Sequence, residues 1–348
     1  MYERITDMSI GEKRTEPVKV SILGSGVTAQ RLLRILKQHP HVRITGLSSG
    51  REQPTVPPDL LKGLDVSYQS LTPDEIADCS DVAFACGHDE VAGRYVPTFL
   101  KRGKKFIDFG GAYRLHDPHE AKQFYQNEDT EHLAQAIYGQ PDLFAEQVRQ
   151  ARFVANPGCY PTASILALAP LVKARVIDFR AAIVIVAWSG YSGAGAAYKP
   201  TKGLRSYKVG EHRHRPEIRQ ALKDYLGAVD PDASEEIRVT FTPFINDDVE
   251  VGLQAHTVAQ LTQPFTTSEV GKLYEMTYRD EALIKVVDSE PDAKDVVGAH
   301  CCQIAVWVQD GVAKAIGSLD NTLKGASTQA VQNMNLMSGF AKNEGLLG

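Results

Sequence analysis

Cys159 occupies a place in the sequence where a thiol could act as a nucleophile. An apolar run ends at Ala155, Asn156-Pro157-Gly158 break it, and a helical pattern follows the cysteine over roughly 161 to 173. A thiol at a helix N-terminus feels the positive end of the helix dipole, which lowers its pKa and makes it more nucleophilic. The alternative is a thiol that only packs in the core. A catalytic Cys159 requires a proton carrier elsewhere in the chain.

The best candidates for that proton carrier lie in EHRHRPEI, residues 211–218, just ahead of an apparent helix. His212 and His214 could each serve as the acid/base, and the interleaved Arg213 and Arg215 indicate recognition of a phosphate or carboxylate. A solvated basic face is one alternative. A metal-binding His pair is another, and it is disfavoured because no third ligand follows at a suitable spacing.

A glycine pattern near the start of the chain predicts a dinucleotide site. LGSGVTA places Gly24, Gly26 and Ala29 between a strand and an amphipathic helix that stops at Pro40. Glycines in this context let the backbone approach a pyrophosphate at the helix N-terminus. The alternative is an ordinary strand–helix turn.

The end of the second predicted strand favours NADP as the nucleotide. An NAD site places a carboxylate there for the ribose hydroxyls, whereas a 2′-phosphate needs hydroxyls and a cation. This chain has Ser48, Ser49 and Arg51, followed by Glu52. A solvated surface loop is the alternative.

The order of predicted elements indicates an α/β protein with two domains. Apolar runs at 18–26, 42–50, 81–87 and 105–111 alternate with helical patterns, which is typical of βαβ units and a parallel sheet. Longer, partly alternating runs at 180–190, 237–245, 249–261 and 300–319 predict a mixed sheet with one face covered by helices. We expect a Rossmann-type NADP-binding domain over 1–158 and an α+β catalytic and dimerisation domain over 159–318. The C-terminal helical segment, 319–348, is expected to return to the first domain.

The net charge and the length of the apolar runs exclude some classes of binding partner. The 348 residues carry a formal net charge of -5, which argues against nucleic acid and anionic membranes as partners. No apolar run approaches the roughly 20 residues that span a bilayer. The polar N-terminus does not resemble a signal peptide. We therefore expect a cytoplasmic protein acting on small molecules.

The remaining cysteines favour packing over chemistry. The chain has five cysteines and no CxxC pair, so a zinc site is not expected and the thiols should be reduced. Cys79, Cys86, Cys301 and Cys302 lie beside or within apolar strands, where small buried thiols are common.

Two further segments could contact a ligand. AWSGYSGAG, residues 187–195, carries Gly190, Gly193 and Gly195 after a buried-looking strand, so it either turns tightly or admits a ligand closely. LDNTLKGAS, residues 319–327, places Asp320 and Asn321 at a probable helix start, where capping alone could explain them.

With these residues identified, the chain resembles the N-acetyl-gamma-glutamyl-phosphate reductase family of the semialdehyde dehydrogenase superfamily. The resemblance spans nearly the whole chain and is carried by VANPGCYPTA, SGYSGAG, EHRHRPEI, FTPF and DNTLKGASTQAVQ. It implies NADPH-dependent reduction of an acyl phosphate to an aldehyde with release of phosphate, as a step of arginine biosynthesis. It also implies a homodimer or homotetramer.

The resemblance implies a role for each matching residue. Cys159 attacks the acyl carbon to form a thioester, which hydride from NADPH then collapses. His214, or secondly His212, handles the protons; Glu217 orients the substrate or the histidine. Backbone N–H groups at the start of the Cys159 helix could stabilise the oxyanion. The remaining implied positions are Asn156, Arg114, His212 and Arg215 for substrate, and Gly24, Ser25, Gly26, Val27, Thr28, Ser48, Ser49, Arg51, Gly193, Ala194 and Asn321 for cofactor.

The sequence departs from the family pattern at several points. The first glycine turn is shorter, with Gln30 beyond it, and Gly110 replaces a serine ahead of Arg114. After FTP the family carries an Arg-Gly pair, whereas this chain reads FINDDVEVG over 244–252. The same chemistry on a related acyl phosphate, such as a carrier-linked one, is therefore an alternative. A Cys–His acyltransferase or hydrolase without nicotinamide, and a nucleotide-sensing regulator, are further ones.

Overall fold

Two seven-stranded sheets form the framework of the protein. The computed structural model describes residues 16–50, 56–87, 89–195, 198–234 and 236–347. The strands of the first sheet are β1 (Val18–Leu23), β2 (Val42–Ser48), β3 (Tyr68–Gln69), β4 (Val82–Ala85), β5 (Lys105–Asp108), β6 (Ile137–Tyr138) and β7 (Phe153–Ala155). They lie in the order β3-β2-β1-β4-β5-β7-β6, and every neighbouring pair is parallel.

Helices connect the strands of this sheet, as the alternating pattern predicted. They are α1 (Val27–Gln38), α2 (Pro58–Leu61), α3 (Pro73–Cys79), α4 (Asp89–Lys101), α5 (Pro118–Tyr125), α6 (Thr130–Leu133) and α7 (Ala145–Gln150). Helix α1 buries one apolar face, formed by Ala29, Leu32, Leu33, Ile35 and Leu36, and ends before Pro40. All residues of β4 are buried, as expected for a strand covered on both faces.

The second sheet is mixed and follows the first in sequence. Its strands are β8 (Ile183–Gly190), β9 (Leu204–Ser206), β10 (Val239–Asn246), β11 (Leu253–Gln260), β12 (Ile284–Val286), β13 (Cys302–Gln309) and β14 (Val312–Leu319). They lie in the order β12-β13-β14-β11-β8-β10-β9, with β8–β10 and β12–β13 parallel and the other pairs antiparallel. This arrangement confirms the predicted fold class.

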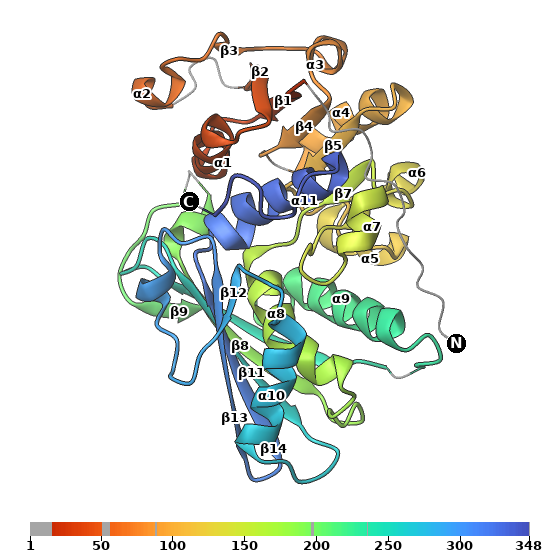
Figure 1. Cartoon of the computed structure of the whole chain (residues 1–348), viewed down its shortest axis with the longest axis vertical. Coiled ribbons are helices and arrows are strands. Elements are labelled where there is room, and N and C mark those ends of the chain that lie inside the picture. Colours follow the sequence, from red (N-terminus) through yellow and green to blue (C-terminus); the bar gives the residue numbers. More distant parts are fainter. Residues whose placement is uncertain (1–15, 51–55, 88, 196–197, 235, 348) are drawn as a thin grey trace, which may run out of the picture.

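One face of the second sheet is covered by α8 (Cys159–Lys173), α9 (His214–Val229) and α10 (Thr267–Tyr278). Helix α8 is buried from Tyr160 to Val172 and lies at the centre of the molecule (Figure 1). The opposite face is more open, since Val184 and Val186 of β8 are each 42% exposed.

Two predicted strands are divided differently in the structure. The run at 300–319 is a hairpin, because Asp310 and Gly311 both adopt positive φ, the requirement of a tight two-residue turn. The run predicted from residue 249 begins as a strand only at Leu253. Gly252, with φ of 126°, ends a turn that precedes it.

The C-terminal region links the two halves of the molecule. After η1 (Tyr191–Ala194) and η2 (Ala293–Val296), the chain forms the π-helical turn η3 (Leu323–Ser327) and then α11 (Thr328–Ser338). Helix α11 packs on α7, α1 and β5, and lies between the two sheets (Figure 1). Val331 and Met334 of α11 join the apolar core beneath β1. Within the described ranges, no helix combines the length and apolarity needed to cross a membrane.

Candidate active site

The carboxyl ends of β1, β4, β5 and β7 meet along one edge of the first sheet. Four loops gather there: 24–26 after β1, 86–87 after β4, 109–111 after β5 and 156–159 after β7. The strand order reverses at β1, which has β2 on one side and β4 on the other. Ligands of open α/β sheets bind in the crevice at such a reversal.

The glycine turn after β1 has the geometry of a phosphate site. Gly24 has φ of 125°, and a Cβ there would lie 2.6 Å from the carbonyl oxygen of Cys86, so only glycine fits. Gly26 caps α1 without any side-chain cap among the described residues, and a Cβ on Gly26 would meet open space. The first N–H groups of α1 can therefore donate hydrogen bonds to a pyrophosphate. Val27, 45% exposed, lies at the same turn.

The hydroxyls of the two serines at the end of β2 have different hydrogen-bond partners. The Ser48 hydroxyl is buried and accepts the Leu71 N–H at 3.2 Å, whereas Ser49 Oγ lies 3.2 Å from Ser25 Oγ of the glycine turn. Arg51 and Glu52, which follow in the sequence, lie outside the described residues.

Cys159 is the first residue of α8, two residues earlier than the predicted start. Gly158 is the N-cap, and Pro161 falls in the first turn, where its missing N–H costs nothing. The predicted lowering of the thiol pKa was wrong. Burial raises the pKa of Cys159 to about 11, although the N–H groups of Tyr160 and Cys159 and the Arg114 guanidinium act to lower it.

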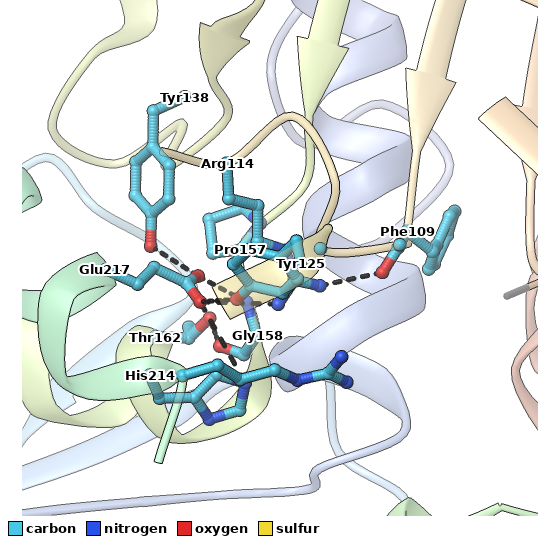
Figure 2. A network of polar contacts seen from close by, with 12 residues as sticks. Phe109, Arg114, Tyr125, Tyr138, Pro157, Gly158, Thr162, His214 and Glu217 are labelled. Atoms are coloured by element: carbon cyan, nitrogen blue, oxygen red, sulfur yellow. Dashed lines mark hydrogen bonds and ion pairs between the residues drawn. The ribbon is translucent and has the colours of Figure 1, made fainter. Parts of the chain in front are cut away.

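Glu217 is the centre of a buried polar network beside Cys159 (Figure 2). Its carboxylate accepts hydrogen bonds from Tyr138 Oη and the Gly158 N–H, both at 2.9 Å, and from Arg114 Nη1 at 3.4 Å. Tyr125 Oη also donates to it at 3.4 Å. Because the Gly158 N–H is already bonded, this group is not available to stabilise an oxyanion. Glu217 instead fixes the corner that carries Cys159.

His214 and His212 are both buried but play different structural roles. A Cβ on Gly158 would lie 2.5 Å from His214 Nε2, so this ring packs directly against the residue before Cys159. His214 Nδ1 is buried without a hydrogen-bond partner in the described part of the chain. His212 Nδ1 accepts the backbone N–H of His214 at 3.2 Å and so supports the start of α9. His214 therefore packs against the residue before Cys159, whereas His212 supports the start of α9.

Burial keeps both histidines neutral. It lowers the pKa of His212 to about 3, with Arg213 and Lys208 adding to the effect. It also lowers the pKa of His214 well below the usual value, assisted by His212 and Arg114. A neutral imidazole is the form that can accept a proton from a thiol.

The other residues implied for substrate binding differ in burial and in their hydrogen-bond partners. Arg114 is buried, and its Nη2 donates to the Phe109 carbonyl at 2.7 Å, while its Nε has no partner within the described ranges. Glu217 raises the pKa of Arg114, against the lowering effect of burial. Asn156 is 1% exposed, with its amide bonded to the Ala326 carbonyl and to Asn333. Arg215 is exposed, on the outer side of α9.

A cleft of about 890 Å³ is lined in part by residues 109–113. Cys159 is not among its lining residues. Arg213 lines this cleft, with its guanidinium over the Tyr125 ring at 5.2 Å and 3.3 Å from an Asp89 oxygen. Arg213, rather than Arg215, is therefore the arginine of HRHR that lines this cleft. Tyr125 and Tyr138 had no distinguishing signal in the sequence, because their partner Glu217 is far away in the chain.

The loop predicted to contact the nicotinamide is held by Asn321. Gly193 and Ala194 of η1 are exposed. Asn321 Nδ2 donates to Ser192 Oγ, and Asn321 Oδ1 accepts the Gly252 N–H, both at 2.9 Å. A Cβ on Gly193 would lie 3.4 Å from Asn321 Nδ2. The segment after β14 thus sets the position of this loop.

The acidic turn that follows β10 binds a neighbouring loop. Asp247 accepts hydrogen bonds from Tyr198 Oη at 2.5 Å and Thr201 Oγ1 at 2.7 Å, and Asp248 accepts the Gly203 N–H at 3.1 Å. The bond from Tyr198 is the largest of several that lower the pKa of Asp247 to about 2. Glu250 is exposed, and its carbonyl accepts the Ser192 N–H at 2.9 Å. The backbone of this turn therefore contacts the glycine loop, while its carboxylates bind the 198–203 segment or are exposed.

The described residues contain no group of three or more His, Cys, Asp or Glu side chains that could hold a metal ion.

Comparison with known proteins identifies the family of this chain. Residues 19–151 match the family model described as semialdehyde dehydrogenase, NAD binding domain, and residues 159–321 match semialdehyde dehydrogenase, dimerisation domain. N-acetyl-gamma-glutamyl-phosphate reductase of Geobacter sp. (strain M21) is 38% identical over 347 residues, covering 94% of this chain and 98% of that one. The same-named protein of Pelotomaculum thermopropionicum is 38% identical over 352 residues, covering 95% and 98%.

Solved structures share the fold at low sequence identity. Aspartate semialdehyde dehydrogenase II of Vibrio cholerae, complexed with ASA, aligns with a TM-score of 0.69 at 16% identity, covering 93% of this chain and 99% of that one. Aspartate semialdehyde dehydrogenase of Candida albicans with NADP aligns with a TM-score of 0.66 at 17% identity, covering 94% and 99%. From its family-model matches and its relatives, this chain belongs to the semialdehyde dehydrogenases, within the N-acetyl-gamma-glutamyl-phosphate reductase family.

Proposed function

We propose that the protein reduces N-acetyl-gamma-glutamyl phosphate to N-acetylglutamate semialdehyde with NADPH, releasing phosphate, as a step of arginine biosynthesis. The observation that carries this proposal is the meeting of His214 and Glu217 at Gly158, the residue before Cys159, on the same sheet edge as the glycine turn. The relatives at 38% identity bear the name of this activity.

The residues of the site account for the covalent half of the reaction. Cys159 Sγ attacks the acyl carbon, the bond from that carbon to the phosphate oxygen breaks, and a thioester forms. Neutral His214 takes the thiol proton as the attack proceeds and holds it on a ring nitrogen. NADPH, when bound, supplies the hydride that reduces the acyl carbon. His214 then returns a proton as the carbon–sulfur bond breaks and the aldehyde leaves.

Glu217 acts on this chemistry through other groups. It holds the Gly158 N–H and the Arg114 guanidinium, and so keeps the start of α8 facing His214. Arg114 Nε and His214 Nδ1, both buried without partners in the described chain, are the polar atoms left for the substrate. We propose that Asn156, Arg215 and His212 contribute only at the edge of this site.

We propose NADP as the preferred nucleotide. Support comes from the hydroxyls of Ser25 and Ser49, which lie 3.2 Å apart at the glycine turn. The pyrophosphate would rest on Ser25, Gly26, Val27 and Thr28, and the nicotinamide on Gly193 and Ala194. Steady-state kinetics with each nucleotide test this: NADP should have the lower KM, and equal KM values would contradict it.

The acidic turn supports a second candidate substrate. Asp248 and Glu250 are exposed carboxylates in the segment where the family carries an Arg-Gly pair, so this turn lacks a cation for a substrate carboxylate. A related acyl phosphate that presents a neutral or cationic group, such as a carrier-linked one, would undergo the same chemistry.

One assay separates these possibilities. Purified protein is given NADP, phosphate and a panel of N-acylated and free semialdehydes, and NADPH formation is followed. The main proposal predicts phosphate-dependent turnover, fastest with N-acetylglutamate semialdehyde, which disappears in Cys159→Ser. Faster turnover of another semialdehyde would select the second candidate. Activity without nucleotide would indicate a hydrolase or acyltransferase instead.

A further inference from the structure

The turn η3 touches the parts of the site that must act together. A Cβ on Gly325 would lie 2.8 Å from Cys159 Cβ, so this turn packs directly on the nucleophile. Ser327 Oγ donates to the Thr28 carbonyl at 3.2 Å, which connects η3 to the first turn of α1. The Ala326 carbonyl accepts Asn156 Nδ2 at 3.2 Å. The turn η3 therefore contacts both the helix that follows the glycine turn and the corner that carries Cys159.

A π-helical turn is rare and occurs frequently at functional sites. The backbone of η3 is bonded internally, since the Asp320 carbonyl accepts the Gly325 N–H at 3.0 Å and the Thr322 carbonyl accepts the Ser327 N–H at 3.2 Å. Side chains connect the turn to its surroundings. Asp320 Oδ1 accepts the N–H groups of Thr322 at 2.7 Å and Leu323 at 3.0 Å, which secures only the start of the turn. The middle of η3 is secured by Lys324.

Lys324 is a fully buried charge whose side chain is 0% exposed. Its ammonium donates to Asp142 Oδ2 at 2.7 Å and to Gln332 Oε1 at 2.8 Å. Asp142, also 0% exposed, lies between β6 and α7 in the first half of the chain, and Gln332 lies on α11. The two bonds tie the middle of η3 to two separate elements.

Further charges complete this cluster at the junction of the two sheets. Lys342 lies 3.9 Å from Asp142 Oδ1 and is paired with Glu281, which precedes β12. Lys342 is 16% exposed and, within the described part of the chain, its ammonium pairs with Asp142 and Glu281 rather than lying on η3 like Lys324. Removing one partner of a buried pair leaves the other charge uncompensated, so the site strongly resists displacement of Lys324.

We propose that Lys324 is a positioning residue. Through its ion pair with Asp142 it holds η3 in place, and η3 in turn fixes the position of the glycine turn relative to Cys159. This inference rests on the proposed function. Cys159 acylation needs only the cysteine corner and His214, whereas reduction also needs the nucleotide at the correct separation. Loosening η3 should therefore slow the complete reaction more than the acylation step.

The experiment compares these two rates in the full-length protein. Acylation of Cys159 is measured with p-nitrophenyl acetate and no nucleotide, and the complete reaction is measured as phosphate-dependent NADP reduction. In Lys324→Met we expect kcat of the complete reaction to fall at least tenfold, with acylation within about twofold of the unaltered protein. Lys324→Arg should restore most of kcat, and Lys342→Met is the matched control that should leave both rates near normal.

Destabilisation is controlled by a second variant. Lys324→Met combined with Asp142→Asn removes both charges of the buried pair. If the single variant fails to fold, this double variant should show the same result, a fall in kcat of the complete reaction with acylation little changed. Equal losses of acylation and kcat, or normal kcat in a folded variant, would overturn the proposal. Lack of turnover in the unaltered protein would instead contradict the proposed function, with acylation by p-nitrophenyl acetate still measurable.

Discussion

Burial governs the protonation of the residues that carry the reaction. The pKa of Cys159 is raised to about 11 and that of His214 is lowered well below its usual value, so both groups are neutral at pH 8. Only about one thiol in a thousand is ionised there. A preformed thiolate–imidazolium pair is therefore not the resting state, and proton transfer must accompany the attack on the acyl carbon.

The first prediction at this scale concerns pH. Since the thiolate is the reactive form and burial raises the pKa, alkylation of Cys159 in the free protein should accelerate about tenfold per pH unit, up to about pH 11. Iodoacetamide kinetics from pH 6 to 11 measure this, with Cys159→Ser to subtract the other thiols. A rate that levels off near pH 8.5 would show an unperturbed thiol.

The two histidines should separate on substitution. His214→Asn removes the proton carrier and should lower kcat by about 10²–10⁴-fold. His212→Asn keeps a side-chain acceptor for the His214 N–H, so its kcat should stay within about tenfold of the unaltered protein. Steady-state kinetics of both variants decide the assignment. A larger loss in His212→Asn than in His214→Asn would reverse the two roles.

Glu217 should matter for stability as well as activity. Glu217→Gln leaves the buried Arg114 without its carboxylate, and breaking such a pair costs about 3–5 kcal/mol in the free energy of unfolding. Tyr138→Phe removes one hydrogen bond to the same carboxylate and should cost about 1 kcal/mol. Urea unfolding of both variants provides the comparison. Equal losses would mean that the ion pair contributes little.

At the scale of elements, the corner before α8 depends on contacts from distant segments. The predicted helix began near residue 161, but the structure begins it at Cys159, with Gly158 as the cap and Glu217 bonded to the Gly158 N–H. No side chain replaces Gly158 easily, because a Cβ would also lie 2.8 Å from Arg114 Nη1. We propose that the first domain ends at this corner, at residue 158, and that 159–318 form the second.

A glycine on η3 gives the element-scale prediction. In Gly325→Ala the added methyl would lie 2.8 Å from Cys159 Cβ and 3.0 Å from Leu319 Cδ1, so overpacking should cost about 1–3 kcal/mol and slow Cys159 alkylation. Gly271→Ala in α10 is the control. Its methyl meets open space, and it should gain up to about 1 kcal/mol. Thermal unfolding measures both, and similar shifts in the two variants would contradict this packing.

At the scale of the whole molecule, the open face of the second sheet is where a second copy would bind. The matching family model is a dimerisation domain, and the face exposes Val184 and Val186 at 42% each. Valines at alternate positions on one sheet face form a flat apolar strip. We propose a homodimer built on this face, with a tetramer as a higher assembly of such dimers.

Charge placed on this face should dissociate the assembly. Val186→Asp would bury a carboxylate in the interface, which is unfavourable without a partner, so we expect a monomer at micromolar concentration. Val297→Asp is the control, because Val297 is 48% exposed but lies outside the sheet strands. Light scattering after gel filtration measures the mass of each. An oligomer that survives Val186→Asp unchanged would place the interface elsewhere.

Local patterns were sufficient for much of the molecule. Alternating strands and helices fixed the parallel sheet, since an amphipathic helix such as α1 is encoded in neighbouring residues. The glycine turn was also recognisable, because Gly24 has the positive φ that glycine favours, and so was the Cys159 corner, because Asn156-Pro157-Gly158 interrupt an apolar run. The chemistry of the site, a cysteine with a nearby histidine, followed from these short motifs.

Only the tertiary structure decided the electrostatics and the support of the site. The pKa of Cys159 reverses its predicted direction because burial, a property of the packed chain, outweighs the helix start. Glu217 meets Tyr138, and Lys324 meets Asp142, across separations of 79 and 182 residues that no local pattern encodes. The sequence by itself determined which residues could react; packing determined their protonation and what holds them in place, because both depend on distant groups brought together by folding.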